Sequence, residues 1–173
     1  KNIVLCFDQT RDHPGYREIS NVEALYRMLD DRGGQLSWYH EGRQSRPALR
    51  WRDAAMTDAR LCVRRAYEFL IDRWEPGDQV YIFGGGRGGY CGQALARLLG
   101  TVGVLPDLLD HVLSAYALPR TPRSERDWHT VQQLAASLAG EREIAVPVTY
   151  LGMWDALRVP GATRHAETEP AAN

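Results

Sequence analysis

The sequence has no long apolar run, no excess of one charge and few cysteines, and each shortage excludes a class of protein. No stretch of the 173 residues approaches the roughly 20 consecutive apolar residues of a transmembrane helix. Lysine and arginine number 21 and the acidic residues 22, so the net charge of -1 implies no nucleic-acid partner. The three cysteines, an odd number, lie in apolar segments, which indicates reduced, buried thiols and neither a disulfide framework nor a zinc site.

The remaining composition is that of an ordinary globular domain. Hydrophobic residues make up 44% and charged residues 25% of the chain, whose length is enough to bury one sizeable core. We expect a single domain over residues 1–161. Residues 162–173 are small and polar, and we expect them to form a flexible tail.

Apolar runs typical of buried strands alternate with segments of helical period. The runs cover residues 2–7, 36–39, 80–83 and 144–151, although Pro147 weakens the start of the last one. Helices are expected from the cap at Ser20 to about 32, over 54–74, from the glycine block to 99, from Pro106, and from Ser124 onward. In the last of these, Trp128, Val131, Leu134 and Leu138 are expected to point inward.

This alternation predicts an α/β fold in which helices cover both faces of a mostly parallel sheet. We expect the strand over 80–83 to be central. Ligands of such folds bind beyond the carboxyl ends of the strands. The predicted strands end at Asp8, His40, Gly84 and Asp155, which should therefore share one rim.

A glycine block follows the central strand, in the order Gly84-Gly85-Gly86-Arg87-Gly88-Gly89-Tyr90. Its outline fits the nucleophile elbow G-x-S-x-G, with glycine where the serine should be. It also fits the phosphate loop G-x-G-x-x-G. The dinucleotide-binding form of this loop normally follows the first strand and has an acidic residue at the end of the next strand. Here neither condition holds. The block also lacks the lysine of a P-loop.

A set of motifs spread from residue 2 to about 155 resembles one family. These motifs are the run from Ile3 to Thr10, Asn21-Val22, Tyr39 with Gly42, the segment 66–70, Pro76-Gly77-Asp78, the glycine block, and the segment 150–155. In this order they are similar to the bacterial α/β-hydrolase domain family that includes the type VI secretion phospholipase effectors. The resemblance implies a three-layer α/β-hydrolase-like domain. It also implies hydrolysis of lipid esters by a serine, an aspartate and a histidine.

The chain departs from the family pattern in three of the motifs. The elbow of the family reads glycine, aromatic, serine, arginine, glycine, alanine, tyrosine, and here Gly86 takes the place of the serine. Gln9 stands where the family usually has glycine, and Ala156 where it usually has threonine. Because glycine has no side chain, Gly86 cannot act as a nucleophile.

The resemblance assigns the other triad positions. Asp155 is the candidate acid, and the alternative is that it caps a turn after its strand. Hydrolases of this class order the triad as nucleophile, acid, histidine, and His165 is the only histidine after Asp155. His165 is thus the candidate base, and the alternatives are a solvated surface histidine here and a base outside this chain.

Two further groups would belong to the site. The backbone N–H of Arg87 would be one oxyanion donor. The loop at Asp8, Gln9 and Thr10 would supply the other donor or form the rim, and a structural role is favoured for Asp8.

The sequence therefore predicts a lipase- or esterase-like domain that is inactive as given, either a degenerate pseudoenzyme or an inactivated variant. One alternative is an active serine ester hydrolase in native form, and another is a glycine-rich module for a nucleotide or anion. We expect no cofactor and no metal, a small-molecule or lipid ester as the ligand, and no nucleic acid.

No signal peptide is evident, so the expected location is cytoplasmic, or secreted without a cleavable signal if the protein is an effector. The sequence specifies no oligomeric state.

Overall fold

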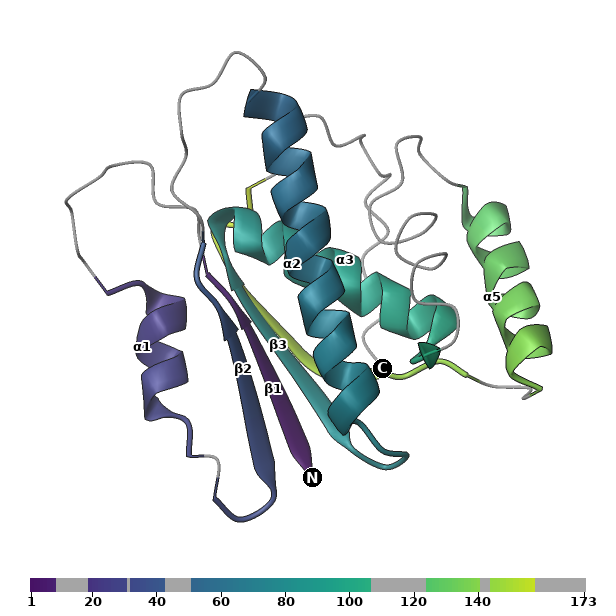
Figure 1. The fold of residues 1–173 in the computed structure, drawn as a ribbon, viewed down its shortest axis with the longest axis horizontal. Helices are drawn as coiled ribbons and strands as arrows, with labels where there is room; N and C mark the ends of the chain where they lie inside the picture. Colours follow the sequence, from purple (N-terminus) through teal and green to yellow (C-terminus); the bar gives the residue numbers. More distant parts are fainter. Residues whose placement is uncertain (9–18, 31, 43–50, 107–123, 141–143, 158–173) are drawn as a thin grey trace.

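The computed structural model describes residues 1–8, 19–30, 32–42, 51–106, 124–140 and 144–157, without the side chains of 51–54, 138 and 139. The strands are β1 (Asn2–Phe7), β2 (Gln35–His40), β3 (Gln79–Gly85) and β4 (Val148–Trp154). The helices are α1 (Asn21–Met28), α2 (Trp51–Arg73), α3 (Gly86–Val102) and α5 (Glu125–Ala139). Figure 1 shows how they are arranged around the sheet.

The four strands form one parallel sheet in the order β2-β1-β3-β4. This confirms the parallel sheet and the inner position of β3. The chain passes from β1 to β2 on one side, and then crosses over β1 to reach β3 on the other side. The order of the strands thus reverses between β1 and β3.

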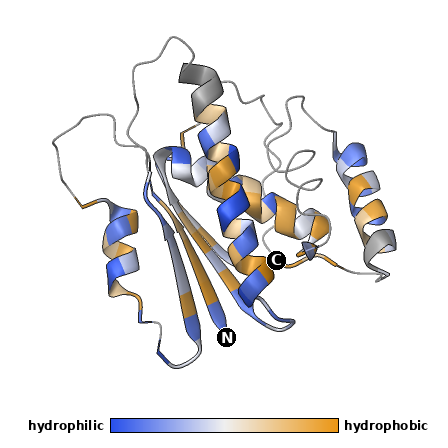
Figure 2. Cartoon of the chain, viewed as in Figure 1, coloured by the Kyte–Doolittle hydropathy of each residue, from blue (hydrophilic) through white to orange (hydrophobic). Residues whose placement is uncertain are grey.

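Helices cover both faces of the sheet, as expected for three layers (Figure 1). On one face, the alternate β1 side chains Ile3, Leu5 and Phe7 pack in a large core with α2 and α3. On the other face, Val4 and Cys6 pack with Val22 of α1 in a smaller cluster. Figure 2 shows apolar residues concentrated on the inner strands and along α3. Because both faces of β1 are buried, its sequence is a continuous apolar run.

Some expectations need correction. Strand β4 begins at Val148 and not at residue 144, because Pro147 has no N–H to donate to the sheet. Leu134 does not point inward; it is 51% exposed, whereas Val131 and Ala135 fill the buried face of α5. The helix expected from Pro106 falls largely on 107–123, which lies outside the described residues.

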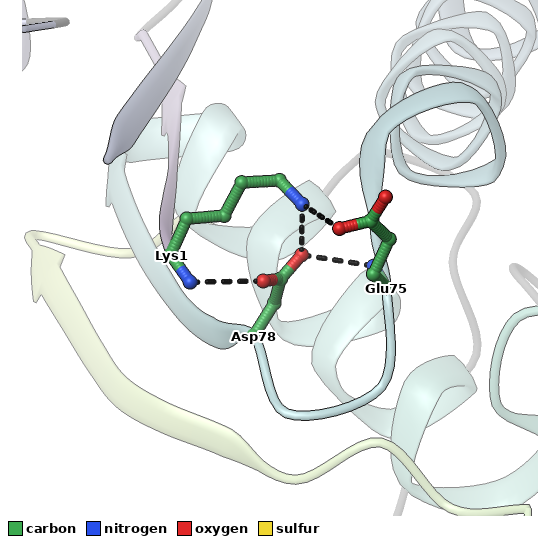
Figure 3. A network of polar contacts seen from close by, with 3 residues as sticks. All are labelled: Lys1, Glu75 and Asp78. Atoms are coloured by element: carbon green, nitrogen blue, oxygen red, sulfur yellow. Dashed lines mark hydrogen bonds and ion pairs between the residues drawn. The ribbon is translucent and has the colours of Figure 1, made fainter. Parts of the chain in front are cut away.

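Opposite the carboxyl ends of the strands, a polar network joins the start of β1 to the turn before β3 (Figure 3). Lys1 Nζ lies 2.8 Å from Asp78 Oδ2 and 2.9 Å from Glu75 Oε2. The backbone nitrogen of Glu75 donates to the same Asp78 oxygen at 2.8 Å. Burial pushes the pKa of Asp78 upward, but the hydrogen bonds from Lys1 and Glu75 outweigh it and lower the pKa to about 2.

We expect this network to make stability dependent on acid pH. The pKa of Asp78 falls from 3.8 to about 2 on folding, so its contribution is complete above pH 4 and is lost as the pH falls toward 2. Urea unfolding at pH 6 and pH 2.5 should show Asp78→Asn losing about 1–2 kcal/mol at the higher pH and much less at the lower. The control is Glu75→Gln, whose side chain is 78% exposed. An equal loss from Asp78→Asn at both pH values would contradict the assignment.

Candidate active site

The candidate site lies at the carboxyl ends of β1 and β3, where the order of the strands reverses. Open parallel sheets bind ligands in the crevice at such a point. The register pairs Phe7 with Gly84 and Gly85 with Trp154, so the loops that follow β1, β3 and β4 begin side by side. The topology therefore brings Asp8, Gly86 and Asp155 to one rim.

The turn from β3 into α3 is as short as the chain permits, since β3 ends at Gly85 and α3 begins at Gly86. Gly86 is buried and has a φ of +52°. L-residues with a side chain rarely adopt this left-handed conformation, whereas glycine does so at little cost. A sharp, strained strand-to-helix turn of this kind holds the nucleophile of an α/β-hydrolase at the top of the sheet.

The glycines on either side of Gly86 are required by close packing. A Cβ on Gly84 would lie 2.6 Å from the Cα of Gly89 in α3. A Cβ on Gly88 would lie 2.3 Å from the carbonyl oxygen of Phe7 and 2.4 Å from that of Asp8. The first turn of α3 therefore packs directly on the end of β1 and on its own strand. This explains the G-x-X-x-G spacing without any bound phosphate.

The third glycine of the phosphate-loop pattern also has a packing reason. A Cβ on Gly89 would lie 3.0 Å from the Cβ of Ala156 and 3.2 Å from the sulfur of Met153. Gly89 therefore makes room for the turn after β4. Close packing thus accounts for Gly84 and Gly89 of this pattern, and the positive φ accounts for Gly86.

Asp155 begins the turn after β4 and is exposed. Its φ of +45° makes it the one non-glycine residue with positive φ in the described part of the chain. Aspartate tolerates this conformation better than most residues, and strained backbone often lies at functional sites. The turn after β4 contacts the turn between β3 and α3, because the Leu157 N–H donates to the Gly86 carbonyl at 2.8 Å.

Asp8 is the buried acid of this rim, with 3% of its surface exposed. Its carboxylate accepts a hydrogen bond from the Tyr39 hydroxyl at 2.6 Å, and its N–H donates to the His40 carbonyl at 3.0 Å. The Tyr39 ring stacks on Tyr26 of α1 at 4.8 Å between centroids. These contacts join Asp8 to β2 and α1.

The remaining predicted site residues are placed only in part. Arg87, the second residue of α3, is half-buried on the same rim. Gln9, Thr10 and His165 lie outside the described residues, as does the predicted domain boundary at 161. His40 stands at the end of β2, where its ring stacks on Trp38 at 5.8 Å.

The sequence did not single out two residues that contact the site. Tyr39 belongs to one of the family motifs, but the motif does not indicate that it contacts Asp8. Period-two alternation along β2 could have placed Tyr39 on the same face of the sheet as Asp8. Leu157 reaches Gly86 through its backbone, and no sequence signal predicts such a contact.

The cysteines offer no replacement nucleophile. Cys6, Cys62 and Cys91 are all free and buried. Burial, with the Asp8 charge, raises the pKa of Cys6 to about 12. The hydrogen bond with Cys91, and then burial, raise the pKa of Cys62 well above its usual value. A thiol held in its neutral form is a poor nucleophile.

Within the described residues, no group of three or more His, Cys, Asp or Glu side chains is placed to hold a metal ion. Nor does any helix in the described ranges combine the length and apolar character needed to cross a bilayer.

Comparison with known proteins identifies the family of the chain. The chain is 29% identical over 191 residues to the uncharacterized protein YEL023C of Saccharomyces cerevisiae, a match that covers 95% of this chain and 28% of that protein. The chain thus spans less than a third of this relative. No solved structure matches the chain significantly. The family model described as "T6SS, Phospholipase effector Tle1-like, catalytic domain" matches residues 1–171, and the chain therefore belongs to this family.

Proposed function

We propose that this chain is a lipid- or carboxylic-ester hydrolase domain that has lost its nucleophile and retains a site for an ester or its acyl group. The observation that carries the proposal is Gly86, buried at the strand-to-helix turn with a φ of +52°. In a serine hydrolase of this fold the nucleophile occupies this position. The membership of the phospholipase effector family supports the choice of ester as the substrate class.

The proposal gives the neighbouring groups definite roles. The backbone N–H of Arg87, directly after Gly86, is the first oxyanion donor. The second donor comes from the loop that begins at Asp8 and includes Gln9 and Thr10. Asp155 is the acid that orients the base and stabilises its charged form, and His165 is the base.

The chain as given should show no useful esterase activity. Without a triad nucleophile, an oxyanion hole and substrate binding alone supply about 10³–10⁴ over the uncatalysed rate, against some 10⁶-fold more in an intact enzyme. Assays with short p-nitrophenyl esters and with phospholipid vesicles should therefore give rates about 10⁶-fold below those of an intact enzyme. Robust hydrolysis by the unmodified chain would contradict the assignment of residue 86.

The second candidate is a glycine-rich site for a nucleotide or anion. The first N–H groups of a helix have no partner within the helix and favour negative charge, and α3 has no side-chain cap at its N-terminus. We place this candidate second because close packing accounts for Gly84 and Gly89 of the phosphate-loop pattern, and because the pattern follows the third strand of the chain and not the first. Calorimetric titration with NAD and ATP separates the two candidates, since micromolar affinity for either nucleotide would favour this one.

A further inference from the structure

The turn after β4 is fixed to the elbow at two points. The N–H of Leu157 donates to the carbonyl of Gly86 at 2.8 Å. One residue earlier, Ala156 lies against α3, because a Cβ built on Gly89 would be only 3.0 Å from the Cβ of Ala156. The backbone of Leu157 is thus held beside the residue that stands at the nucleophile position.

The side chain of Leu157 is nevertheless 60% exposed. Other large apolar side chains with more than half their surface exposed are Ile19, Met28, Leu134 and Tyr150. Among these exposed side chains of the described residues, only Leu157 belongs to a residue with a backbone hydrogen bond to Gly86. An exposed apolar side chain on a residue whose backbone is bound to the site is suited to contact an apolar part of the ligand.

We propose that Leu157 is a ligand contact of this site, and that its side chain packs on the alkyl chain of an acyl group. The inference rests on the proposed function, because it takes residue 86 as the place where the acyl carbonyl is bound. An alkyl chain that extends from Gly86 along Leu157 loses contact with water at each methylene, and its affinity rises with the area buried. The same contact serves a free fatty acid and an acyl ester.

The test is calorimetric titration of the unmodified chain with octanoate, butanoate and the 1-monoacylglycerols of both acids, below their micelle concentrations. We expect the octanoyl ligands to bind about tenfold more tightly than the butanoyl ligands. Leu157→Ser should reduce this ratio to about threefold or less. Leu134→Ser is the matched control, because Leu134 is 51% exposed on α5, and it should leave the ratio unchanged.

Circular dichroism of both variants, with their thermal midpoints, establishes that each is folded. If only Leu157→Ser loses the preference for octanoyl over butanoyl ligands, the contact is supported. Comparing the affinities of the acid and of its glycerol ester shows whether the site accepts a free fatty acid or an acyl ester. The proposal is overturned if no octanoyl ligand binds, if the ratio survives in Leu157→Ser, or if it falls equally in Leu134→Ser. These readouts need no hydrolysis, so they are independent of whether Gly86→Ser hydrolyses esters.

Discussion

Gly86→Ser should convert the chain into an ester hydrolase. The substitution places a hydroxyl at the start of α3, on the rim that bears Asp155 and directly before the Arg87 N–H. We expect hydrolysis of short p-nitrophenyl or phospholipid esters to rise at least about 10³-fold over the unmodified chain. The gain should cost about 1–2 kcal/mol of stability, because serine must adopt the φ of +52° that glycine adopts freely.

Two further substitutions in the Gly86→Ser background examine the roles of the other triad candidates. If Asp155 is the triad acid, Asp155→Asn should lower the new activity by about 10⁴, since the base loses its orienting carboxylate. His165→Ala should remove the activity if His165 is the base. A folded Gly86→Ser protein that stays inactive would contradict the account, because the site would then lack more than its nucleophile.

Gly88→Ala should destabilise the fold strongly. The new Cβ would lie 2.3 Å from the carbonyl oxygen of Phe7. That oxygen belongs to the backbone of β1, so no flexible side chain can move to relieve the clash. Strand β1 and the first turn of α3 would have to separate, at a cost of about 3 kcal/mol or more. The free energy of unfolding in urea measures this loss.

Gly100→Ala is the matched control in the same helix, since a Cβ at Gly100 would meet nothing within 4 Å. Alanine favours helix over glycine by up to about 1 kcal/mol at both positions. Gly100→Ala should therefore be neutral or slightly stabilising. Equal stability of the two variants would show that α3 does not pack closely on β1.

The sequence predicted the fold well because its strands carry strong local signals. The apolar run of β1 matched residues Asn2–Phe7 as expected, and the glycine block marked the turn after the inner strand. The start of β4 was predicted too early, since the apolar pattern continues through Ile144 to Val146, whereas the lack of an N–H at Pro147 delays the strand.

The site was less predictable because its contacts join distant parts of the chain. The letters around Gly86 predicted an elbow or a phosphate loop, but not which of its glycines the packing requires. That requirement depends on Phe7, Asp8 and Ala156, which pack on the first turn of α3 only in the folded chain. The Tyr39 hydrogen bond to Asp8 likewise depends on the pairing of β2 with β1.

The central claim is that residue 86 occupies the nucleophile position of an ester hydrolase, and covalent labelling tests it most directly. An alkyl fluorophosphonate reacts with a serine that a neighbouring base activates. After incubation with this reagent, peptide mass spectrometry should find one adduct in the Gly86→Ser chain, on the introduced hydroxyl, and none in the unmodified chain. Labelling of a serine elsewhere in the unmodified chain, or of a serine other than residue 86 in the Gly86→Ser chain, would contradict the claim. A folded Gly86→Ser chain without any adduct would show that the site lacks its base as well.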